Sequence, residues 1–359
     1  LLDDEILNRT GALQALVRSL ADRLSANPAS GQGSAQVITL LPRDPGLEMQ
    51  EFTSQLSDCL GKQGQVADPA AMRRDGVVGD AVNLPSEHPA WLRFEAWVET
   101  QRHEGDFVLL VTNGEDNPWT RACVAQADRV LLLVDADSSP ARSGSELTVL
   151  EGMEGSQAAS VWLVLTHSAD REMPSGTAAW LEPRTVSHHA HVRRGNRRDM
   201  ARLARWLNGQ TRGLALSGGG ARGFVHLGVV AAMYESGYEI DLIAGTSAGA
   251  MAGGLLARGE SPEPMMEAAL KIIEAAGNPF VEFDLPLISI LRSQRMREGL
   301  HGTYRETAIE DSWIPLRIVV TDLTESRRKV FDRGLVWERV LAASSPPGIM
   351  APVMDEGHL

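Results

Sequence analysis

The chain is poor in the residues on which several classes of protein depend. It has only two cysteines, Cys59 and Cys123, which are too few for a disulfide framework, and neither belongs to a Cys-x-x-Cys pair. No apolar run reaches the roughly 18 residues that a membrane-spanning helix needs. Positive charge is also scarce, because 34 Lys and Arg residues stand against 47 Asp and Glu residues, for a net charge of −13. Nucleic acid is therefore not expected as a partner, since phosphate binding requires a strongly positive surface.

The length of 359 residues predicts two domains, or one large domain with an extension. Hydrophobic residues make up 43% of the chain and charged residues 23%, as in globular proteins. We interpret residues 1–34 as a linker that includes an amphipathic helix, with Leu13, Leu16, Val17, Leu20 and Leu24 at helical spacing. This helix is either a packing arm or a coupling element to a domain ahead of Leu1, and both interpretations stay open. Because the chain does not begin with Met, we expect Leu1 to be a cut end.

Residues 35–210 predict a Rossmann-like α/β domain with a doubly wound parallel sheet. Apolar runs that are typical of strands buried on both faces lie at 36–41, 107–112, 129–134 and 161–166, and they alternate with helical patterns at 47–61, 89–103, 117–127 and 197–208. Such alternation favours a parallel sheet covered by helices on both sides. The first strand is not followed by a glycine-rich phosphate loop, and the role of this domain stays unknown.

Two groups of residues in this half allow a functional interpretation. His188, His189 and His191 with Asp199 are candidate metal ligands, but adjacent residues of a strand point to opposite faces and the spacing matches no recognised metal site. A polar strand end is the favoured interpretation. The second group is a run of arginines, which predicts a solvated helix face with an acidic partner across an interface, and secondarily a contact with phospholipid head groups: Arg193, Arg194, Arg197, Arg198, Arg202 and Arg205.

The second half contains a candidate nucleophile at Ser247. A short apolar strand at 241–244 leads into Gly245-Thr246-Ser247-Ala248-Gly249, and a helix of small residues follows. A sharp strand-to-helix turn exposes a serine hydroxyl for attack, and it needs Gly245 and Gly249 because larger side chains there would clash. The turn also places the positive end of the helix dipole at the reacting centre. The pattern alone is weak, but its position between a strand and a helix strengthens it.

A second glycine-rich loop lies one helix and one strand earlier. The strand at 214–216 runs into Gly218, Gly219, Gly220, Ala221, Arg222 and Gly223, and a helix over about 224–236 follows, with Gly237 as its left-handed cap. Consecutive glycines expose backbone N–H groups at a helix N-terminus, which suits an oxyanion. Arg222 would fix the loop or add positive potential. Both loops should emerge at the same edge of a parallel sheet, where α/β proteins place active sites.

The same glycines also match a dinucleotide-binding fingerprint. Gly218, Gly220 and Gly223 fit G-x-G-x-x-G between a strand and a helix. That function requires an acidic residue at the end of the next strand to bind a ribose. Glu239 and Asp241 stand before that strand instead, so dinucleotide binding is kept only as a remote alternative.

The passages SGGGARG and GTSAG, in this order, resemble the patatin-like phospholipases. The passages NPWTRACVAQADRVLLLVD and IEDSWIPLRIVVTDLTESRRKVF resemble the neuropathy target esterase branch of that family. The resemblance implies a three-layer α/β/α catalytic domain over 211–359, a Ser–Asp dyad with Ser247 as nucleophile, and an oxyanion hole at Gly218–Gly223. It also implies a cyclic-nucleotide-binding-like domain ahead of this chain.

The family's second catalytic residue is an Asp in an Asp-Gly-Gly or Asp-Gly-Ala motif, and no Asp after Ser247 precedes a glycine. The passage SSPPGIMAPVMDEGHL resembles the approach to that motif, so this Asp is expected a few residues beyond Leu359. Asp355 is a weak substitute candidate. A His-based triad would have to use His301 or His358, since His226 lies on the first helix, where a packing or capping role is favoured.

The residues and the resemblance together predict a serine esterase that hydrolyses acyl esters of phospholipids or lysophospholipids through an acyl-enzyme on Ser247. A catalytically silent regulatory or scaffold protein with the same fold is the alternative. The chemistry requires neither a metal nor another cofactor. The expected location is cytoplasmic with peripheral membrane contact, any anchor lies outside this chain, and the oligomeric state stays open.

Residues 278–296 form an apolar stretch that leads to a testable prediction. Part of this apolar, proline-interrupted stretch is expected to form a cap over the acyl-chain site. Replacing Phe280 or Leu287 with Asp should therefore lower the hydrolysis of long-chain esters more than that of short-chain esters. Comparing kcat/KM for the two ester classes tests this, and an equal loss on both would contradict the cap.

Overall fold

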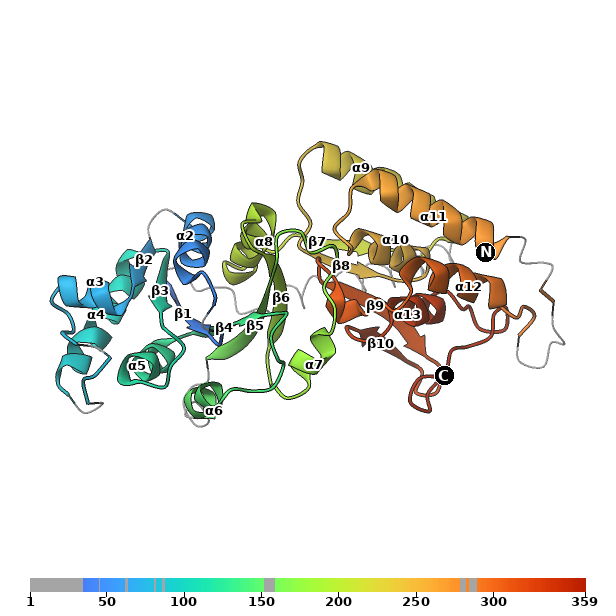
Figure 1. Ribbon diagram of the computed structural model, residues 1–359. Coiled ribbons are helices and arrows are strands. Elements are labelled where there is room, and N and C mark those ends of the chain that lie inside the picture. Colours follow the sequence, from blue (N-terminus) through green and yellow to red (C-terminus); the bar gives the residue numbers. More distant parts are fainter. Residues whose placement is uncertain are drawn as a thin grey trace, which may run out of the picture.

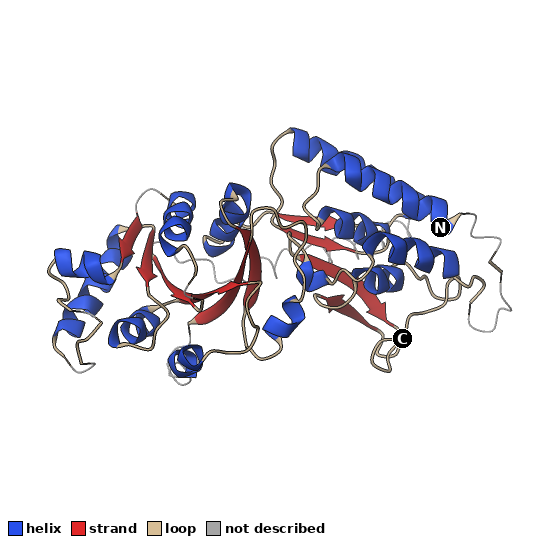
Figure 2. Cartoon of the chain, viewed as in Figure 1, coloured by secondary structure: helices blue, strands red, loops and turns tan. Residues whose placement is uncertain are grey.

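The computed structural model describes residues 35–44, 46–61, 64–80, 82–85, 88–151, 159–277, 282–283 and 289–359. A six-stranded sheet in the first half and a four-stranded sheet in the second form the framework of these residues, with helices packed around them (Figures 1 and 2). The fold class predicted from the sequence, a doubly wound parallel α/β half followed by a three-layer α/β/α half, is confirmed. The helix expected within 1–34 lies outside the described residues.

The first sheet is entirely parallel, with the strand order β2-β3-β1-β4-β5-β6. Its strands are β1 (Gln36–Pro42), β2 (Gly64–Ala67), β3 (Phe107–Val111), β4 (Arg129–Asp135), β5 (Ser160–His167) and β6 (His188–Arg193). Successive strand residues face opposite sides, as the pleat requires. In β1, Ile38 and Leu40 share a core with helices on one face, whereas Val37 belongs to the core of the other face.

The helices of this half are α2 (Met49–Leu60), α3 (Pro69–Arg74), α4 (Ala90–Glu104), α5 (Pro118–Gln126), α6 (Gly144–Glu151), α7 (Thr177–Leu181) and α8 (Arg197–Leu207). Several begin at polar caps: the Asn117 side chain accepts a hydrogen bond from Thr120 N, and Pro118 occupies the first turn, where no N–H is needed. The predicted helices and the buried strands match the observed elements. The sequence patterns did not predict β2 and α3, because the four-residue edge strand and the six-residue helix are too short to show a periodicity.

The second sheet has the order β10-β9-β8-β7. Its strands are β7 (Gly213–Leu216), β8 (Leu242–Gly245), β9 (Leu316–Asp322) and β10 (Arg327–Phe331), and only the β9–β10 pair is antiparallel. Leu216 pairs with Gly245 at the carboxyl ends of β7 and β8. The loops that leave these two neighbouring strands therefore start side by side.

The second half also contains a 3-10 turn, η1 (Gly220–Gly223), and a shorter one, η3 (Ile309–Asp311). Its helices are α9 (Phe224–Glu235), α10 (Ala248–Leu256), α11 (Pro262–Ala276), α12 (Gln294–Tyr304) and α13 (Val336–Ala343). Helix α10 lies within the core, where a Cβ on Gly253 would be 3.0 Å from the Ile243 side chain and one on Gly254 would be 3.0 Å from Val336. Among the helices that the structure describes, none combines the length and apolar character needed to cross a bilayer.

The arginine run of α8 joins the two halves. Arg205 forms two hydrogen bonds with the fully buried carboxylate of Asp241, at 2.6 and 2.8 Å, and Arg202 donates to the carbonyl of Trp313. The predicted acidic partner across an interface is thus present. The expectation that the run is solvated is wrong for Arg202 and Arg205, whose side chains are only 13% and 16% exposed, because Trp313 and Asp241 of the second half contact them.

The histidines of β6 lie in the same seam. His191 Nε2 donates to the carbonyl of Glu310 at 2.8 Å, and its Nδ1 bonds to His167 Nε2 at 2.9 Å. Burial, together with the neighbouring His167, lowers the pKa of His191 to about 3. His188 instead lies against two tryptophans on the other face of the strand. The polar strand end expected here is therefore buried in part, because the second half covers it.

Asp199 does not join the histidines as a ligand. Its carboxylate accepts hydrogen bonds from Arg193 and Arg202. No group of three or more His, Cys, Asp or Glu residues within the described ranges has a geometry that would hold a metal ion.

The Arg205–Asp241 contact predicts a measurable contribution to stability. Asp241→Asn removes a negative charge beside the half-buried guanidinium of Arg205. The free energy of unfolding should therefore fall by about 3 kcal/mol, which is the lower end of the cost of removing one partner of a buried ion pair. Urea denaturation followed by circular dichroism measures this. The control is Asp116→Asn, which breaks the exposed Arg121–Asp116 pair and should leave the midpoint nearly unchanged; equal shifts would contradict the assignment.

Candidate active site

Ser247 lies at the strand-to-helix turn between β8 and α10. Its backbone has φ 52° and ψ −127°, a conformation that costs a non-glycine residue free energy and that recurs at functional turns. It is the residue just before the first turn of α10, so the positive end of the helix dipole lies next to its hydroxyl. The Oγ atom makes no hydrogen bond with any residue that the structure describes, and the side chain is half-buried.

The residues on either side of Ser247 must be glycines for a steric reason that the structure makes explicit. A Cβ on Gly245 would collide with the carbonyl of Gly249, and a Cβ on Gly249 would collide with the carbonyl of Leu216. The turn is closed by a hydrogen bond from Thr246 N to the Leu216 carbonyl at 3.2 Å. The backbone of the turn therefore packs directly against the end of β7.

The glycine-rich loop after β7 meets this turn. A Cβ placed on Gly218 would lie 3.1 Å from the Ser247 Cβ and 3.8 Å from its Oγ, and one placed on Gly223 would collide with Ala248. Gly220 has φ 53°, which favours glycine. The backbone N–H groups of Gly218 and Gly219 donate to no acceptor in the described part of the chain. The structure thus brings together the serine and the loop that the sequence singled out.

Arg222 and His226 hold different positions near this loop. The Arg222 side chain is exposed and has no hydrogen-bond or ion-pair partner within the described residues, so it supplies positive potential rather than a contact that fixes the loop. His226, on the first turn of α9, bonds through Nε2 to the carbonyl of Ser217 at 2.8 Å. This bond connects α9 to the start of the glycine loop. The sequence did not predict Ser217 as the partner of His226, because this contact depends on how the glycine loop folds back over α9.

An apolar cavity of about 480 Å³ begins at Ser247. This volume is in the range of small-molecule binding sites. The cavity extends between α9, α10, α11 and the segment before α12, and its lining includes Leu227, Met251, Leu255, Ile273, Leu291 and Met296. An apolar lining that ends at the Ser247 hydroxyl is suited to an acyl chain. The predicted cap residues Phe280 and Leu287 lie outside the described residues.

A second cavity of about 480 Å³, with a more polar lining, also borders Ser247 and includes Asp355. Asp355 lies in the turn that closes through the Asp355–His358 backbone pair. Its carboxylate accepts hydrogen bonds from Lys329 at 2.7 Å and Arg339 at 2.6 Å. Burial acts to raise the pKa of Asp355, but these two cations outweigh it and hold the pKa below its usual value. A carboxylate held in this way is a poor proton acceptor.

The histidines considered for a triad do not activate the serine in this arrangement. His301 is exposed and lies 3.4 Å from Glu306. His358 lines the polar cavity, and its Nδ1 is 3.3 Å from Asp322. His226 is committed to Ser217. Within the described residues, none of the three forms a hydrogen bond with Ser247.

The acidic residues required for dinucleotide binding are also committed elsewhere. Asp241 and Glu239 both bind Arg205, at 2.6 and 2.7 Å. They belong to the seam between the two halves rather than to the glycine loop.

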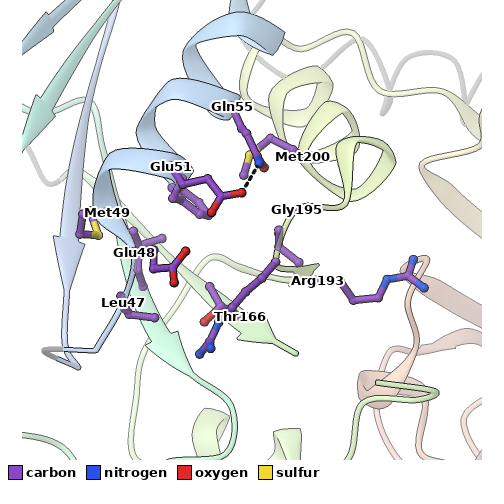
Figure 3. A pocket seen from close by; sticks show the side chains of 13 residues that line it. Leu47, Glu48, Met49, Glu51, Gln55, Thr166, Arg193, Gly195 and Met200 are labelled. Atoms are coloured by element: carbon purple, nitrogen blue, oxygen red, sulfur yellow. Dashed lines mark hydrogen bonds between the residues drawn. The ribbon is translucent and has the colours of Figure 1, made fainter. Parts of the chain in front are cut away.

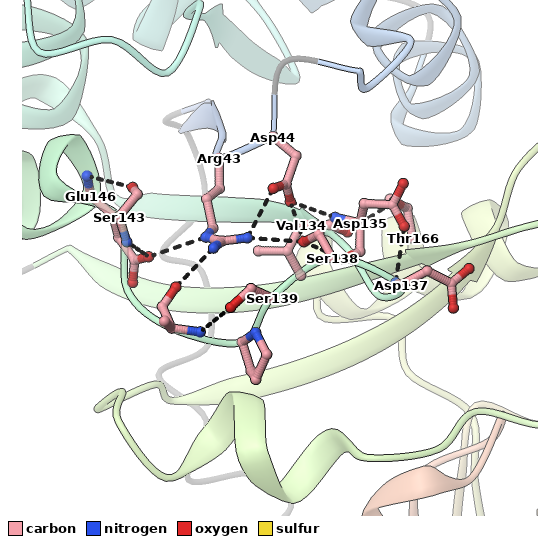
Figure 4. Close-up of polar contacts among 12 residues, drawn as sticks. Arg43, Asp44, Val134, Asp135, Asp137, Ser138, Ser139, Ser143, Glu146 and Thr166 are labelled. Carbon is pink, nitrogen blue, oxygen red and sulfur yellow. Dashed lines mark hydrogen bonds and ion pairs between the residues drawn. The ribbon is translucent and has the colours of Figure 1, made fainter.

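The carboxyl edge of the first sheet carries a polar network in the position where a phosphate loop would follow β1 (Figure 4). Arg43 and Asp44 pair with each other at 2.8 Å, and Asp44 accepts hydrogen bonds from Asp135 N and Ser138 Oγ. The cavity beside this edge, between α2 and the end of β6, measures only about 40 Å³ (Figure 3). Such a space is far below the size of a nucleotide site.

Comparison with known proteins matches each half to a described family. Residues 214–358 match the family described as patatin-like phospholipase, and residues 34–209 match the Neuropathy Target Esterase family P-loop like domain. The human protein named Patatin-like phospholipase domain-containing protein 6 is 30% identical over 367 residues, which is 93% of this chain and 26% of that protein. The protein named Lysophospholipase nte1 from Emericella nidulans is 28% identical over 391 residues, which is 93% of this chain and 25% of that protein. The chain spans about a quarter of the length of these curated relatives.

The bond from His226 to the glycine loop predicts an effect on the reactivity of Ser247. His226→Ala should slow labelling of Ser247 by a fluorophosphonate about tenfold, less than the roughly 10²-fold or greater loss seen when an oxyanion donor itself is removed. His226→Gln, which keeps an N–H donor, should recover part of the rate. His301→Ala serves as the control, and a rate for His226→Ala equal to that of the unaltered protein would contradict a positioning role.

Proposed function

Since residues 214–358 form a patatin-like phospholipase domain and residues 34–209 a Neuropathy Target Esterase family P-loop like domain, we propose that this chain hydrolyses acyl esters of phospholipids or lysophospholipids. The observation that carries the proposal is the contact between a strained Ser247 and the glycine loop, whose Gly218 and Gly219 N–H groups are unbonded within the described residues. The names of the relatives, a patatin-like phospholipase domain-containing protein and a lysophospholipase, support the substrate class.

In the proposed mechanism, Ser247 Oγ attacks the ester carbonyl carbon while its proton passes to a base. The negative charge that develops on the carbonyl oxygen is stabilised by the backbone N–H groups at 218–220, which are already oriented before the reaction. The tetrahedral intermediate collapses, the alcohol leaves with a proton, and an acyl-enzyme on Ser247 remains. Water then attacks the acyl-enzyme, and the fatty acid is released.

We assign the base to the Asp of an Asp-Gly-Gly or Asp-Gly-Ala motif beyond Leu359, as the family resemblance implies. The structure supports this assignment indirectly, because two candidate residues that line the polar cavity beside Ser247 are engaged elsewhere. Asp355 is held by two cations, and His358 lies beside Asp322. No metal or other cofactor enters any of these steps.

The substrate would occupy the apolar cavity with one acyl chain. Because this cavity ends at Ser247, the ester bond of a chain bound in it would lie at the nucleophile. A lysophospholipid, which has a single acyl chain, fits such a site directly, and peripheral contact with a membrane would supply it.

Labelling with a fluorophosphonate tests the nucleophile. The probe should label the protein, and Ser247→Ala should abolish both labelling and the release of fatty acid from lysophosphatidylcholine. Asp355→Asn, in contrast, should keep the labelling rate within about threefold, because its carboxylate neutralises Lys329 and Arg339 rather than accepting the serine proton. Labelling that survives Ser247→Ala would remove the assignment. A protein with the Asp-Gly motif present that takes up no probe and releases no fatty acid would favour the silent alternative.

A further inference from the structure

Helix α9 is apolar on nearly every side, yet one of its sides faces solvent. Its sequence, FVHLGVVAAMYE, contains one acidic residue, Glu235, at its last position, and one histidine, His226, which bonds to the Ser217 carbonyl. Leu227 and Val230 are buried against the core, whereas Val225 is 66% exposed and Val229 is 46% exposed. A helix without a polar side is normally covered on all sides. Among the residues that the structure describes, nothing therefore supplies the full cover of the outward side of α9 that its sequence predicts.

Helix α11 extends this apolar surface. It packs against α9, and the two helices lie together on the side of the second half away from its sheet (Figure 1). Leu270 is 50% exposed, and Met266 and Ile273 are each 38% exposed. We call the exposed apolar residues of the two helices the α9–α11 face: Phe224, Val225, Val229, Met266, Leu270 and Ile273.

The apolar cavity opens on this face. Phe224 and Ile273 both line the cavity and are both exposed, so they mark its mouth between the start of α9 and the end of α11. The apolar surface is thus continuous from the outside of the protein, past these two residues, to Ser247. A partner that covers the face must leave this opening accessible to substrate, which a second protein chain on the same face would block.

The charges beside the face restrict the partner further. The exposed side of α11 carries Glu263, Glu267 and Glu274, against the single cation Lys271, which pairs with Glu267 at 2.7 Å. The exposed Arg222, two residues before Phe224, adds a second cation, but the three carboxylates still outnumber the two cations. The border of the face therefore keeps a net acidic charge, and an anionic surface would be repelled. A surface of zwitterionic lipid has no net charge to oppose it.

We propose that the α9–α11 face docks on a zwitterionic phospholipid bilayer, so that an acyl chain enters between Phe224 and Ile273 without crossing water. The role of this docking rests on the proposed function, because it would deliver substrate to Ser247. Its evidence, the exposed apolar surface of α9 and α11, does not depend on that function. The driving force is the burial of exposed apolar side chains in the interfacial region of the bilayer, because the border of the face carries no net positive charge.

Vesicle co-sedimentation tests the docking face. The variant Val229→Glu/Leu270→Glu changes two exposed residues that do not line the cavity, and Leu92→Glu, on α4 of the first half, is the matched control because Leu92 is 68% exposed on a helix. With phosphatidylcholine vesicles, the double variant should bind at least tenfold more weakly than the unaltered protein, and Leu92→Glu should bind normally. Turnover of a short-chain, water-soluble ester should be retained in both. Equal binding by the double variant would overturn the proposal.

Two further measurements separate this proposal from other outcomes. Binding should be unaffected by added salt and no stronger on phosphatidylglycerol vesicles; binding that requires anionic lipid would overturn it. If the unaltered protein is a dimer and the double variant a monomer by light scattering, the face is a self-association surface instead. Ser247→Ala should bind vesicles normally, so the docking result stands even if the assigned chemistry at Ser247 fails.

Discussion

The direct approach of two backbone turns, at the carboxyl ends of β7 and β8, determines where every other part of the site lies. Gly249 packs against the carbonyl of Leu216, Gly245 packs against Gly249, and Gly223 packs against Ala248. No side chain separates these turns, so Ser247 is held in a strained conformation by contacts that leave it little room to relax. The 218–223 loop and Ser247, to which we assign the oxyanion hole and the nucleophile, are consequently positioned by the same packing rather than by flexible side chains.

Contacts elsewhere in the structure stabilise the elements that carry these two turns. Tyr304, at the end of α12, donates a hydrogen bond to the carbonyl of Met251 at 2.7 Å. This bond connects α12 to α10, the helix that follows Ser247. The first half reaches the same framework through Glu310: its carbonyl accepts a hydrogen bond from His191, and its carboxylate accepts one from Gly334 N, just before α13. Helix α13 leads to Ser344, which lines both cavities beside Ser247. A continuous path of packed elements therefore connects the first half to the site.

Local sequence signals were sufficient wherever the physical requirement was local. The clash between Gly245 and Gly249 lies within one turn, so the glycine pattern around Ser247 indicated its geometry, whereas Gly249 meets Leu216 and Gly223 meets Ala248 across the two turns. The buried strands and longer helices were also evident from their periodicity. Two contacts were not evident from the sequence. Arg202 binds the carbonyl of Trp313, 111 positions later, and the contact of His226 with Ser217 depends on how the glycine loop folds back. Asp355 was only a weak candidate for the base from the sequence, and its ion pairs with Lys329 and Arg339, which local patterns do not predict, weaken it further.

The distribution of charge explains why the membrane contact that we propose relies on apolar side chains. A protein with a net charge of −13 would need a local basic surface to bind anionic lipid, and the arginine run between Arg193 and Arg205 is the evident candidate. Three of these arginines, Arg193, Arg202 and Arg205, instead bind Asp199 and Asp241 within the seam between the halves. Their charges are neutralised there, so they stabilise the arrangement of the two halves and cannot also attract head groups. What remains beside the mouth of the cavity is apolar surface with an acidic border, and such a surface gains free energy from a bilayer only by burying its side chains.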